Sequence, residues 1–262
     1  MSAIITSIYN CPVKSISFQN IDKCKINKNI GIEGDRVFAF SQNLDLDQSK
    51  EFEKNPEARK GKWNKIVTLK NTPVFNKYNF LYENNKLTLT IKDKEIITIN
   101  INDSNERDNL VKKLIELEGS LKKDIKLMRN DEHPFYDTSI SNKSMFRNSI
   151  SLLNINSIKD FENKINQKIE KSIFRGNLYF DGIEAWEERN WIGKTIKIND
   201  VLFKVEKNIP RCVAINLKPK TDDNSFNLLK TLKETYDHYD MGVYLTPEND
   251  GEINLSEKIL IK

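Results

Sequence analysis

The residue with the sharpest chemical potential is Cys212, which lies in the segment IPRCVA. Arg211 precedes it, and a cation beside a thiol favours the thiolate, the form that binds soft metal ions. Cys212 follows a turn that contains Pro210 and lies at the start of the strand expected at 213–217. A cysteine in such a position can point into the open mouth of a barrel instead of its core. The alternative is that Cys212 is a small hydrophobic residue of a core. The spacing alone leaves both interpretations open.

Arginine is scarce in this chain, which holds 34 Lys and 8 Arg. An arginine is preferred where a planar fork must grip a carboxylate or a phosphate at two points. One of the eight, Arg36, ends the glycine-punctuated turn GIEGDR, whose glycines permit positive φ and close backbone approach. The turn either presents Arg36 to an anionic group at a strand mouth or forms a hairpin with a structural Asp35–Arg36 pair.

Two other motifs supply polar groups at the ends of expected strands. PVKS places Lys14 and Ser15 after the first strand, and FRGN places Arg175 and Asn177 before a later one. A helix expected to begin near Ser157 would direct its free N–H groups and positive dipole end toward a nearby phosphate. With Arg36 and a soft thiolate, these groups suit an anionic cofactor that carries a soft or oxo metal.

Several functional classes lack their motifs. The chain has no Walker A loop, no G-x-G-x-x-G after a strand and no G-x-S-x-G. The chain has two histidines, His133 and His238, which are too few for a His-rich metal site. Its three cysteines, Cys11, Cys24 and Cys212, form no C-x-x-C pair, which disfavours structural zinc and a disulfide framework.

Composition and charge narrow the expected partners and the expected cellular location. The 262 residues include 31% charged residues of both signs, mixed along the chain with a net charge of +4, and no aromatic–basic stripe. This balance disfavours a nucleic-acid partner. No apolar run approaches the roughly 18–20 residues of a membrane span, and the N-terminus lacks the pattern of a secretory signal. We therefore expect a cytoplasmic protein with reduced thiols and no membrane partner.

The elements that must position these groups are mainly strands. Alternating or apolar runs predict strands at 3–8, 21–26, 37–40, 66–69, 78–82, 86–91, 95–99, 177–180, 195–198, 201–205, 213–217, 242–245 and 259–261. Helices are expected at 105–118, capped by Asp103 or Ser104, from Ser157 onward, and at 226–236. Residues 130–148 are predicted to form a polar loop or lid. The fold class is mostly β with α (α+β), with domains at 1–105 and 106–262.

The order of these motifs resembles the MOSC family, named for the C-terminal domain of molybdenum cofactor sulfurase. The family includes the mitochondrial amidoxime-reducing component and bacterial relatives. The N-terminal matches are CPVKS and GIEGDR, and the later ones are SLLNINS, FRGN, WEE with WIG, RC and HYDMGVY. The resemblance implies a MOSC β-barrel domain packed with an N-terminal MOSC-type, β-barrel-like domain.

The resemblance also implies a molybdenum cofactor (Mo-molybdopterin) held between the two parts. Cys212 takes the position of the cysteine that ligates molybdenum in the reductase members, which makes it the expected metal ligand and catalytic residue. The positions expected to bind the cofactor are Lys14, Ser15, Arg36, Ser157, Arg175, Asn177 and Arg211. Two departures stand out, because Gly176 replaces a usual Pro and residues 47–62 match an expected Arg-x-x-Pro segment poorly.

The leading hypothesis is a molybdenum-cofactor oxidoreductase that reduces N- or S-oxygenated small molecules by oxygen-atom transfer. Nothing in the chain resembles the fused ferredoxin domain of some relatives. Electrons would therefore come from a separate donor protein of the ferredoxin, flavoprotein or cytochrome type. The alternative hypothesis is a carrier of sulfur or molybdenum cofactor without substrate turnover.

Four other conspicuous residues are interpreted as structural, each with a functional alternative. Trp186 and Trp191 are interpreted as core or hinge packing, with a cover over the cofactor as the alternative. His238 and Asp240 are interpreted as a structural turn before a strand, although a proton-shuttling role is open because histidine titrates near neutral pH.

Overall fold

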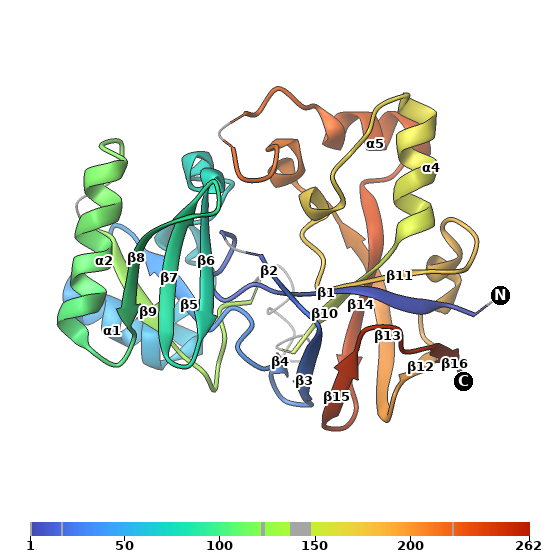
Figure 1. Ribbon diagram of the computed structural model, residues 1–262, viewed down its shortest axis with the longest axis horizontal. Coiled ribbons are helices and arrows are strands. Elements are labelled where there is room, and N and C mark those ends of the chain that lie inside the picture. The colour runs from blue at the N-terminus through green and yellow to red at the C-terminus, as the bar shows by residue number, and fades with distance from the viewer. Residues whose placement is uncertain (1, 17, 122–123, 137–147, 222) are drawn as a thin grey trace. The chain divides into compact units, whose positions relative to one another are not determined.

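The fold is mainly β, as expected from the sequence. The computed structural model describes residues 2–16, 18–121, 124–136, 148–221 and 223–262 (Figure 1). The strands of these residues are β1 (Ile4–Asn10), β2 (Gln19–Ile21), β3 (Lys23–Asn27), β4 (Gly31–Ile32), β5 (Phe38–Ser41), β6 (Tyr78–Glu83), β7 (Lys86–Ile91), β8 (Lys94–Asn100), β9 (Lys126–Arg129), β10 (Ile150–Asn154), β11 (Leu178–Asp181), β12 (Thr195–Ile198), β13 (Val201–Pro210), β14 (Asp240–Pro247), β15 (Gly251–Asn254) and β16 (Ile259–Ile261).

The described residues contain fewer α-helices than strands. The α-helices of the described residues are α1 (Leu46–Lys54), α2 (Ser104–Leu117), α4 (Ile155–Ile165) and α5 (Leu228–Tyr236). The 3₁₀ helices are η1 (Pro56–Arg59), η2 (Trp63–Lys65), η3 (Pro73–Lys77), η5 (Lys171–Phe174), η6 (Glu187–Trp191) and η7 (Val213–Asn216). The predicted α+β class is confirmed.

The chain divides into two compact units, each built from separate stretches of sequence. Unit 1 comprises Met1–Asn10, Asn20–Glu33 and Phe146–Lys262, and unit 2 comprises Cys11–Gln19 and Gly34–Met145. The domains expected from the sequence are two contiguous stretches, residues 1–105 and 106–262. These domain bounds stay a prediction, because the division into compact units does not test them.

Unit 1 is organised by a curled sheet with the strand order β16-β12-β13-β14-β10-β11-β1-β2. The start of β1 also binds the segment that leads into β16. Ile5 N donates to Glu257 O at 2.9 Å, and Ile259 N donates to Ala3 O at 2.9 Å. An antiparallel bridge joins Ile4 and Lys258 between these bonds. The sheet therefore curls until β1 and the approach to β16 meet, as in a barrel.

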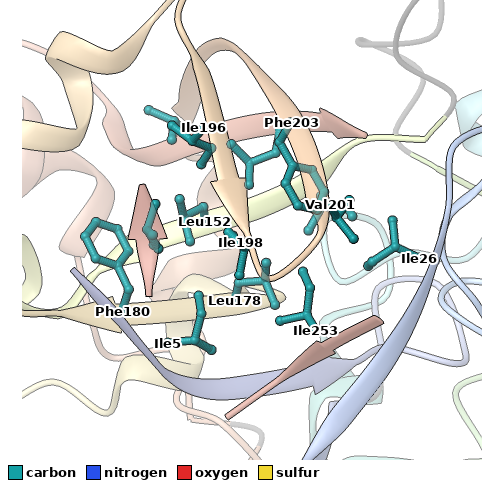
Figure 2. Packing of buried hydrophobic residues seen from close by; sticks show 14 of the residues in the cluster. Ile5, Ile26, Leu152, Leu178, Phe180, Ile196, Ile198, Val201, Phe203 and Ile253 are labelled. Atoms are coloured by element: carbon teal, nitrogen blue, oxygen red, sulfur yellow. The ribbon is translucent and has the colours of Figure 1, made fainter. Parts of the chain in front are cut away.

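The interior of this curled sheet is apolar. Figure 2 shows aliphatic and aromatic side chains from β1, β10, β11, β12 and β13 directed toward one another, with Ile26 and Ile253 from β3 and β15 beside them. Leu152, Leu178 and Phe203 are fully buried there. A second apolar cluster of unit 1 combines α4 and α5 with η5 and η7, and it includes Phe161, Leu232 and Ile215. Helices and loops thus cover one side of the sheet, where the expected chemistry falls.

Unit 2 has two smaller sheets. One pairs β5 with β9, and the other is the antiparallel meander β6-β7-β8. Helix α2 begins after Asp103, whose side chain accepts hydrogen bonds from Asn105 N and Glu106 N, so one of the two expected caps is the actual cap. Helix α1 was not expected from its polar sequence, although Asp45 and Gln48 form a capping box at its start.

Three local predictions are wrong. Residues 66–69 form no strand, and only an isolated bridge joins Ser41 to Ile66. Residues 213–216 form the 3₁₀ helix η7 instead of a strand, because Ile215 N bonds Cys212 O at 3.1 Å and the buried Ile215 packs into the cluster under α5. Helix α4 is capped by Asn154, not Ser157. Of the predicted loop at 130–148, residues 137–147 lie outside the described residues.

Candidate functional site

Cys212 differs from the other two cysteines in exposure. Cys11 and Cys24 are buried, whereas Cys212 is exposed. It lies two residues after the end of β13, with Arg211 between, and is the N-cap residue of η7, with Val213 beside it 46% exposed. The interpretation of Cys212 as a core residue is therefore excluded. A thiol in this position is accessible to a ligand, although it begins a 3₁₀ helix and not the expected strand.

Arg211 holds the backbone around this cysteine. Its Nη1 donates to Phe174 O at 2.7 Å, its Nε donates to Met241 O at 3.0 Å, and its Nη2 also bonds Met241 O. Burial lowers the pKa of Arg211, and the nearby Tyr244, Tyr179 and Cys212 oppose that shift. The guanidinium thus joins the end of η5 to the start of β14 and positions the chain at Cys212. Its expected contact with a cofactor stays a prediction.

We call the contacts of Arg211 with Phe174 O and Met241 O the Arg211 clamp. Arg175 lies at the η5 end of this clamp. It ends η5 in the left-handed conformation with φ 52°, and its N–H bonds Ser172 O at 2.9 Å. Phe174, whose carbonyl Arg211 holds, immediately precedes Arg175. The structure therefore brings Arg175, Arg211 and Cys212 together within unit 1 through η5 and η7.

The departure at Gly176 has a steric cause. A Cβ built on Gly176 would lie 2.4 Å from Leu153 Cδ1 and 3.1 Å from the ring of Tyr179. The Gly176 N–H also donates to the Tyr179 hydroxyl at 3.0 Å. Proline has no N–H to donate. The packing of Tyr179 thus explains why this chain has glycine after Arg175.

Asn177 ties strands of the barrel sheet together. Its N–H donates to Ser151 Oγ at 2.8 Å, and the same hydroxyl donates to Asn177 Oδ1 at 2.8 Å. Its Nδ2 reaches Tyr9 O at 3.3 Å. The side chain is 1% exposed and links β10 and β1 at the edge of β11. These contacts orient the loop that carries Arg175.

Ser157 is engaged in a buried network. Its Oγ donates to the Glu188 carboxylate at 2.8 and 3.0 Å and accepts the Trp186 N–H at 2.8 Å. Asn154 Nδ2 also donates to Glu188, at 3.1 Å. Burial raises the pKa of Glu188, although its hydrogen bonds partly oppose this. Because Asn154 Oδ1 accepts the Asn156 N–H at 2.9 Å, Ser157 is left to bind Glu188. Expected phosphate contact by Ser157 stays a prediction.

Trp186 and His238 belong to an aromatic group around Asp160. The Asp160 carboxylate accepts from Trp186 Nε1 at 2.8 Å and from the Tyr236 hydroxyl at 2.7 Å. His238 stacks on Tyr236, and its Nδ1 accepts the Asp240 N–H at 3.1 Å. Burial, followed by the charge of Arg189, lowers the pKa of His238. This geometry favours the packing and turn interpretations for Trp186, His238 and Asp240.

Unit 2 holds the other expected site residues. Lys14 is 5% exposed, and its N–H donates to Phe38 O at 2.8 Å. Arg36 pairs with Asp35 through Nη1, and the other Asp35 oxygen accepts the Cys11 N–H at 2.7 Å. Arg36 N in turn donates to Cys11 O. The motifs around Cys11 and Arg36, separated in sequence, therefore form one hydrogen-bonded corner.

Three of the expected site residues share a strained backbone. Ser15 has φ 64°, Arg36 has φ 55° and Arg175 has φ 52°. Each non-glycine residue in this region costs roughly 1–2 kcal/mol, and such residues are concentrated at functional sites. The strain is a signal that the residue types and the motif order did not supply. It occurs in both units, at these three residues and also at residues outside the motifs such as Lys92 and Ser256.

The described residues contain no cluster of three or more His, Cys, Asp or Glu side chains that could hold a metal ion. A metal held only by such side chains therefore has no support in this part of the chain. Among the helices that the structure describes, none has the length and hydropathy of a membrane span.

The exposed cysteine after β13 and the strands from β10 to β15 lie in the part of the chain that matches a known domain family. Residues 137–259 match the model of the MOSC domain. This part of the chain is a MOSC domain, and the resemblance drawn from its motifs is confirmed there. The resemblance of the N-terminal motifs to a MOSC-type barrel domain stays a prediction.

One curated relative is mitochondrial amidoxime reducing component 2 of Rattus norvegicus, 33% identical over 72 residues. The aligned stretch covers 28% of this chain and about a fifth (21%) of the relative's length.

Two solved structures illustrate the structural comparison. The YUAD protein from Bacillus subtilis has a TM-score of 0.44 and 11% identity, over 100% of this chain and 96% of that one. YiiM from Geobacillus stearothermophilus has a TM-score of 0.35 and 15% identity, over 43% of this chain and 53% of that one.

Proposed function

We propose that this chain binds a molybdopterin-type molybdenum cofactor, with the Cys212 thiolate as the protein's ligand to molybdenum. The observation that carries the proposal is the exposed Cys212 fixed beside the partly buried Arg211 clamp within a MOSC domain. A thiolate is a suitable ligand for a soft metal site. A cofactor that brings its own sulfur ligands needs one protein ligand, which fits the lack of a multi-ligand metal cluster in the described residues.

The chain's own residues would bind and orient this group. Arg211 keeps its hydrogen bonds to Met241 O and Phe174 O and so fixes the backbone that carries Cys212. Arg175 is proposed to bind the anionic phosphate, and Lys14 and Arg36 stay predicted anion-binding residues. Backbone strain at Arg175 and Arg36 supports a role that overrides local conformational preference.

The proposed activity is the reduction of N- or S-oxygenated small molecules, with electrons from a separate donor protein. When bound, the cofactor would supply the two-electron chemistry of oxygen-atom transfer. The name of the rat relative, an amidoxime reducing component, supports an amidoxime as the first substrate to test. Cys212 would contact the metal, and the cationic residues would neutralise the phosphate without taking part in the chemistry.

The first test measures molybdenum by elemental analysis and pterin by fluorescence after acid oxidation, on full-length protein made in a cofactor-producing host. Cys212→Ser is compared with Cys24→Ala, which removes a buried thiol of the same unit. We expect close to one molybdenum per wild-type chain, unchanged by Cys24→Ala and strongly reduced or spectroscopically altered by Cys212→Ser. Absence of both molybdenum and pterin from the wild type would overturn the proposal.

A second test separates the oxidoreductase from a carrier. Molybdenum-loaded protein is incubated with benzamidoxime and a chemically reduced viologen dye as electron donor, and benzamidine is measured. Turnover by the wild type and not by Cys212→Ser supports the oxidoreductase. A persulfide on Cys212, detected by mass spectrometry, without any turnover would favour the carrier, which an exposed thiol also permits.

A further inference from the structure

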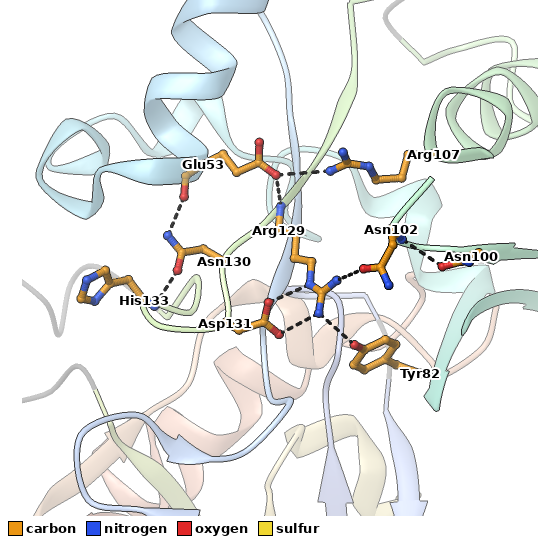
Figure 3. Close-up of polar contacts among 9 residues, drawn as sticks. All are labelled: Glu53, Tyr82, Asn100, Asn102, Arg107, Arg129, Asn130, Asp131 and His133. Atoms are coloured by element: carbon orange, nitrogen blue, oxygen red, sulfur yellow. Dashed lines mark hydrogen bonds and ion pairs between the residues drawn. The ribbon is translucent and has the colours of Figure 1, made fainter. Parts of the chain in front are cut away.

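Residues 130–136 of unit 2 form a loop that is fastened at its start. Figure 3 shows Glu53, from α1, accepting a hydrogen bond from the Arg129 N–H at 2.8 Å. Asn130 Nδ2 donates to Glu53 O at 2.6 Å, and Asn130 Oδ1 accepts the His133 N–H at 2.7 Å. Asn130 N also donates to Val37 O at 2.9 Å, next to Arg36. The loop thus leaves β9 in a defined direction.

A buried arginine fastens the same loop further along. Arg59 is 5% exposed, and its Nη1 donates to His133 O at 2.7 Å. Its Nε and Nη2 donate to Phe52 O and Glu53 O, the last carbonyls of α1, at 2.6 and 2.9 Å. Its guanidinium carbon lies 3.9 Å from the centre of the Phe135 ring. Burial lowers the pKa of Arg59 to about 10, so it remains charged at neutral pH.

These hydrogen bonds place Tyr136 beside the hydrogen-bonded corner that contains Arg36. The Phe135 N–H donates to Arg36 O at 2.8 Å, which fixes the residue before Tyr136 against the strained turn. The Arg36 guanidinium carbon lies 5.8 Å from the centre of the Tyr136 ring. Burial and the Asp35 carboxylate raise the pKa of Tyr136, and Arg36 opposes this, so both charges act on the phenol.

Arg36 therefore has two different groups against its guanidinium. The Asp35 carboxylate, itself held by the Cys11 N–H, pairs with one edge. The Tyr136 ring lies within cation–π distance. Groups that orient a binding residue commonly affect ligand affinity by 10- to 100-fold without touching the ligand. Simple packing would not require the loop to be fastened to Arg36 itself.

We infer that Tyr136 is a positioning residue for the anion-binding Arg36, holding the Arg36–Asp35 pair in the orientation that receives the cofactor phosphate. This inference rests on the proposed function for the identity of the anion. The positioning of Arg36 can be tested without it. Tyr136 was not among the site residues expected from the motifs, because it lies in a polar segment that matched none of them.

The test compares Tyr136→Leu with Tyr82→Leu in the full-length chain. Tyr82 is a matched control because it lies in the same unit and its hydroxyl accepts from Arg129 at 3.3 Å instead of facing Arg36. We expect Tyr136→Leu to release molybdenum cofactor about tenfold faster than wild type. Tyr82→Leu should stay within about twofold. Combined with Arg36→Ala, Tyr136→Leu should add little, because residues that act through one interaction are non-additive.

A second measurement needs no cofactor. The exchange of the Arg36 Nε–H with solvent is followed by NMR in ¹⁵N-labelled, cofactor-free protein. We expect Tyr136→Leu to speed this exchange at least tenfold and Tyr82→Leu to leave it unchanged. Equal exchange in both variants would overturn the inference. If wild-type protein carries no cofactor, the proposed function fails, and the exchange experiment still decides whether Tyr136 positions Arg36.

Discussion

In each unit an arginine holds backbone carbonyls, buried in the case of Arg59 and partly buried in the case of Arg211, but the two arginines fasten different groups. In unit 1, Arg211 binds Met241 O and Phe174 O and fixes the chain at Cys212. In unit 2, Arg59 binds four carbonyls, those of Phe52, Glu53, His133 and Pro134, and fixes the loop that ends at Tyr136. Among the described residues, neither guanidinium forms an ion pair with a carboxylate. Arg36, by contrast, pairs with Asp35.

The contrast between these arginines shows that a scarce arginine can have two structural roles. In a lysine-rich chain, arginine indicates a place that needs a planar fork. The fork can receive an anion, as proposed for Arg36, or it can replace missing secondary-structure bonds by holding carbonyls. Arg211 was singled out because a cysteine follows it, whereas Arg59 lies in a segment that matched no motif. Both clamps are of the second kind.

The largest effect is expected from Arg59→Met in unit 2. The substitution removes a charged donor from four carbonyls and a ring contact, so we expect the free energy of unfolding to fall by about 3 kcal/mol. Urea unfolding measures this. Arg107→Met is the control, because its pair with Glu53 is 3.5 Å long and partly exposed, and it should cost under about 1 kcal/mol. Equal losses for both variants would show that the clamp is not special.

Arg211→Met should have a slightly smaller effect, about 2 kcal/mol, because two carbonyls lose their donor instead of four. The comparison variant is Arg189→Met, whose ion pair with Asp240 is 3.5 Å long. That variant should stay within about 1 kcal/mol of wild type in urea unfolding. A larger loss for Arg189→Met than for Arg211→Met would contradict the assignment of the clamp in unit 1.

Glycine positions sharpen the contrast between the units. Gly176→Ala should destabilise unit 1 by about 1–3 kcal/mol, since the new Cβ would overlap Leu153. Gly119 of unit 2 has no atom within 4 Å of an added Cβ, so Gly119→Ala should stay within about 0.5 kcal/mol. Thermal or urea unfolding of both variants tests the steric account of Gly176. A neutral Gly176→Ala variant would refute it.

The smallest effect is expected in the pH dependence of the Glu188 network. Burial raises the pKa of Glu188 above its ordinary value of 4.5, so the folded protein keeps a proton that the unfolded chain has released. Stability from this group is therefore present at low pH and falls as pH rises from 4.5 through the raised pKa. Glu188→Gln should remove that component of the slope.

Urea unfolding between pH 4 and 8 measures the difference between wild type and variant. Glu187→Gln, at the exposed neighbouring position, should keep the wild-type slope. If the Glu188→Gln curve runs parallel to the wild-type curve throughout, the buried carboxyl is not the source of the effect.

The sequence by itself determined the elements whose signals are local. Strands β7, β12 and β16 have the bounds that their apolar patterns predict, and Asp103 caps α2 as its position before the apolar stripe indicates. Alternation and capping depend on residues a few positions apart, so one chain segment carries them. The order of motifs around Cys212 and Arg36 identified the MOSC resemblance for the same reason.

Only the tertiary structure decided what the polar residues bind. Ser157 meets Glu188 from 31 residues away, and Arg59 meets His133 from 74 residues away. No local pattern reports such pairs. Residues 213–216 form η7 because Ile215 finds a buried place beside α5, which overrides the strand-like apolar run. Tyr136 reaches Arg36 because a clamp built from α1 and β9 holds its loop, and that geometry exists only after folding.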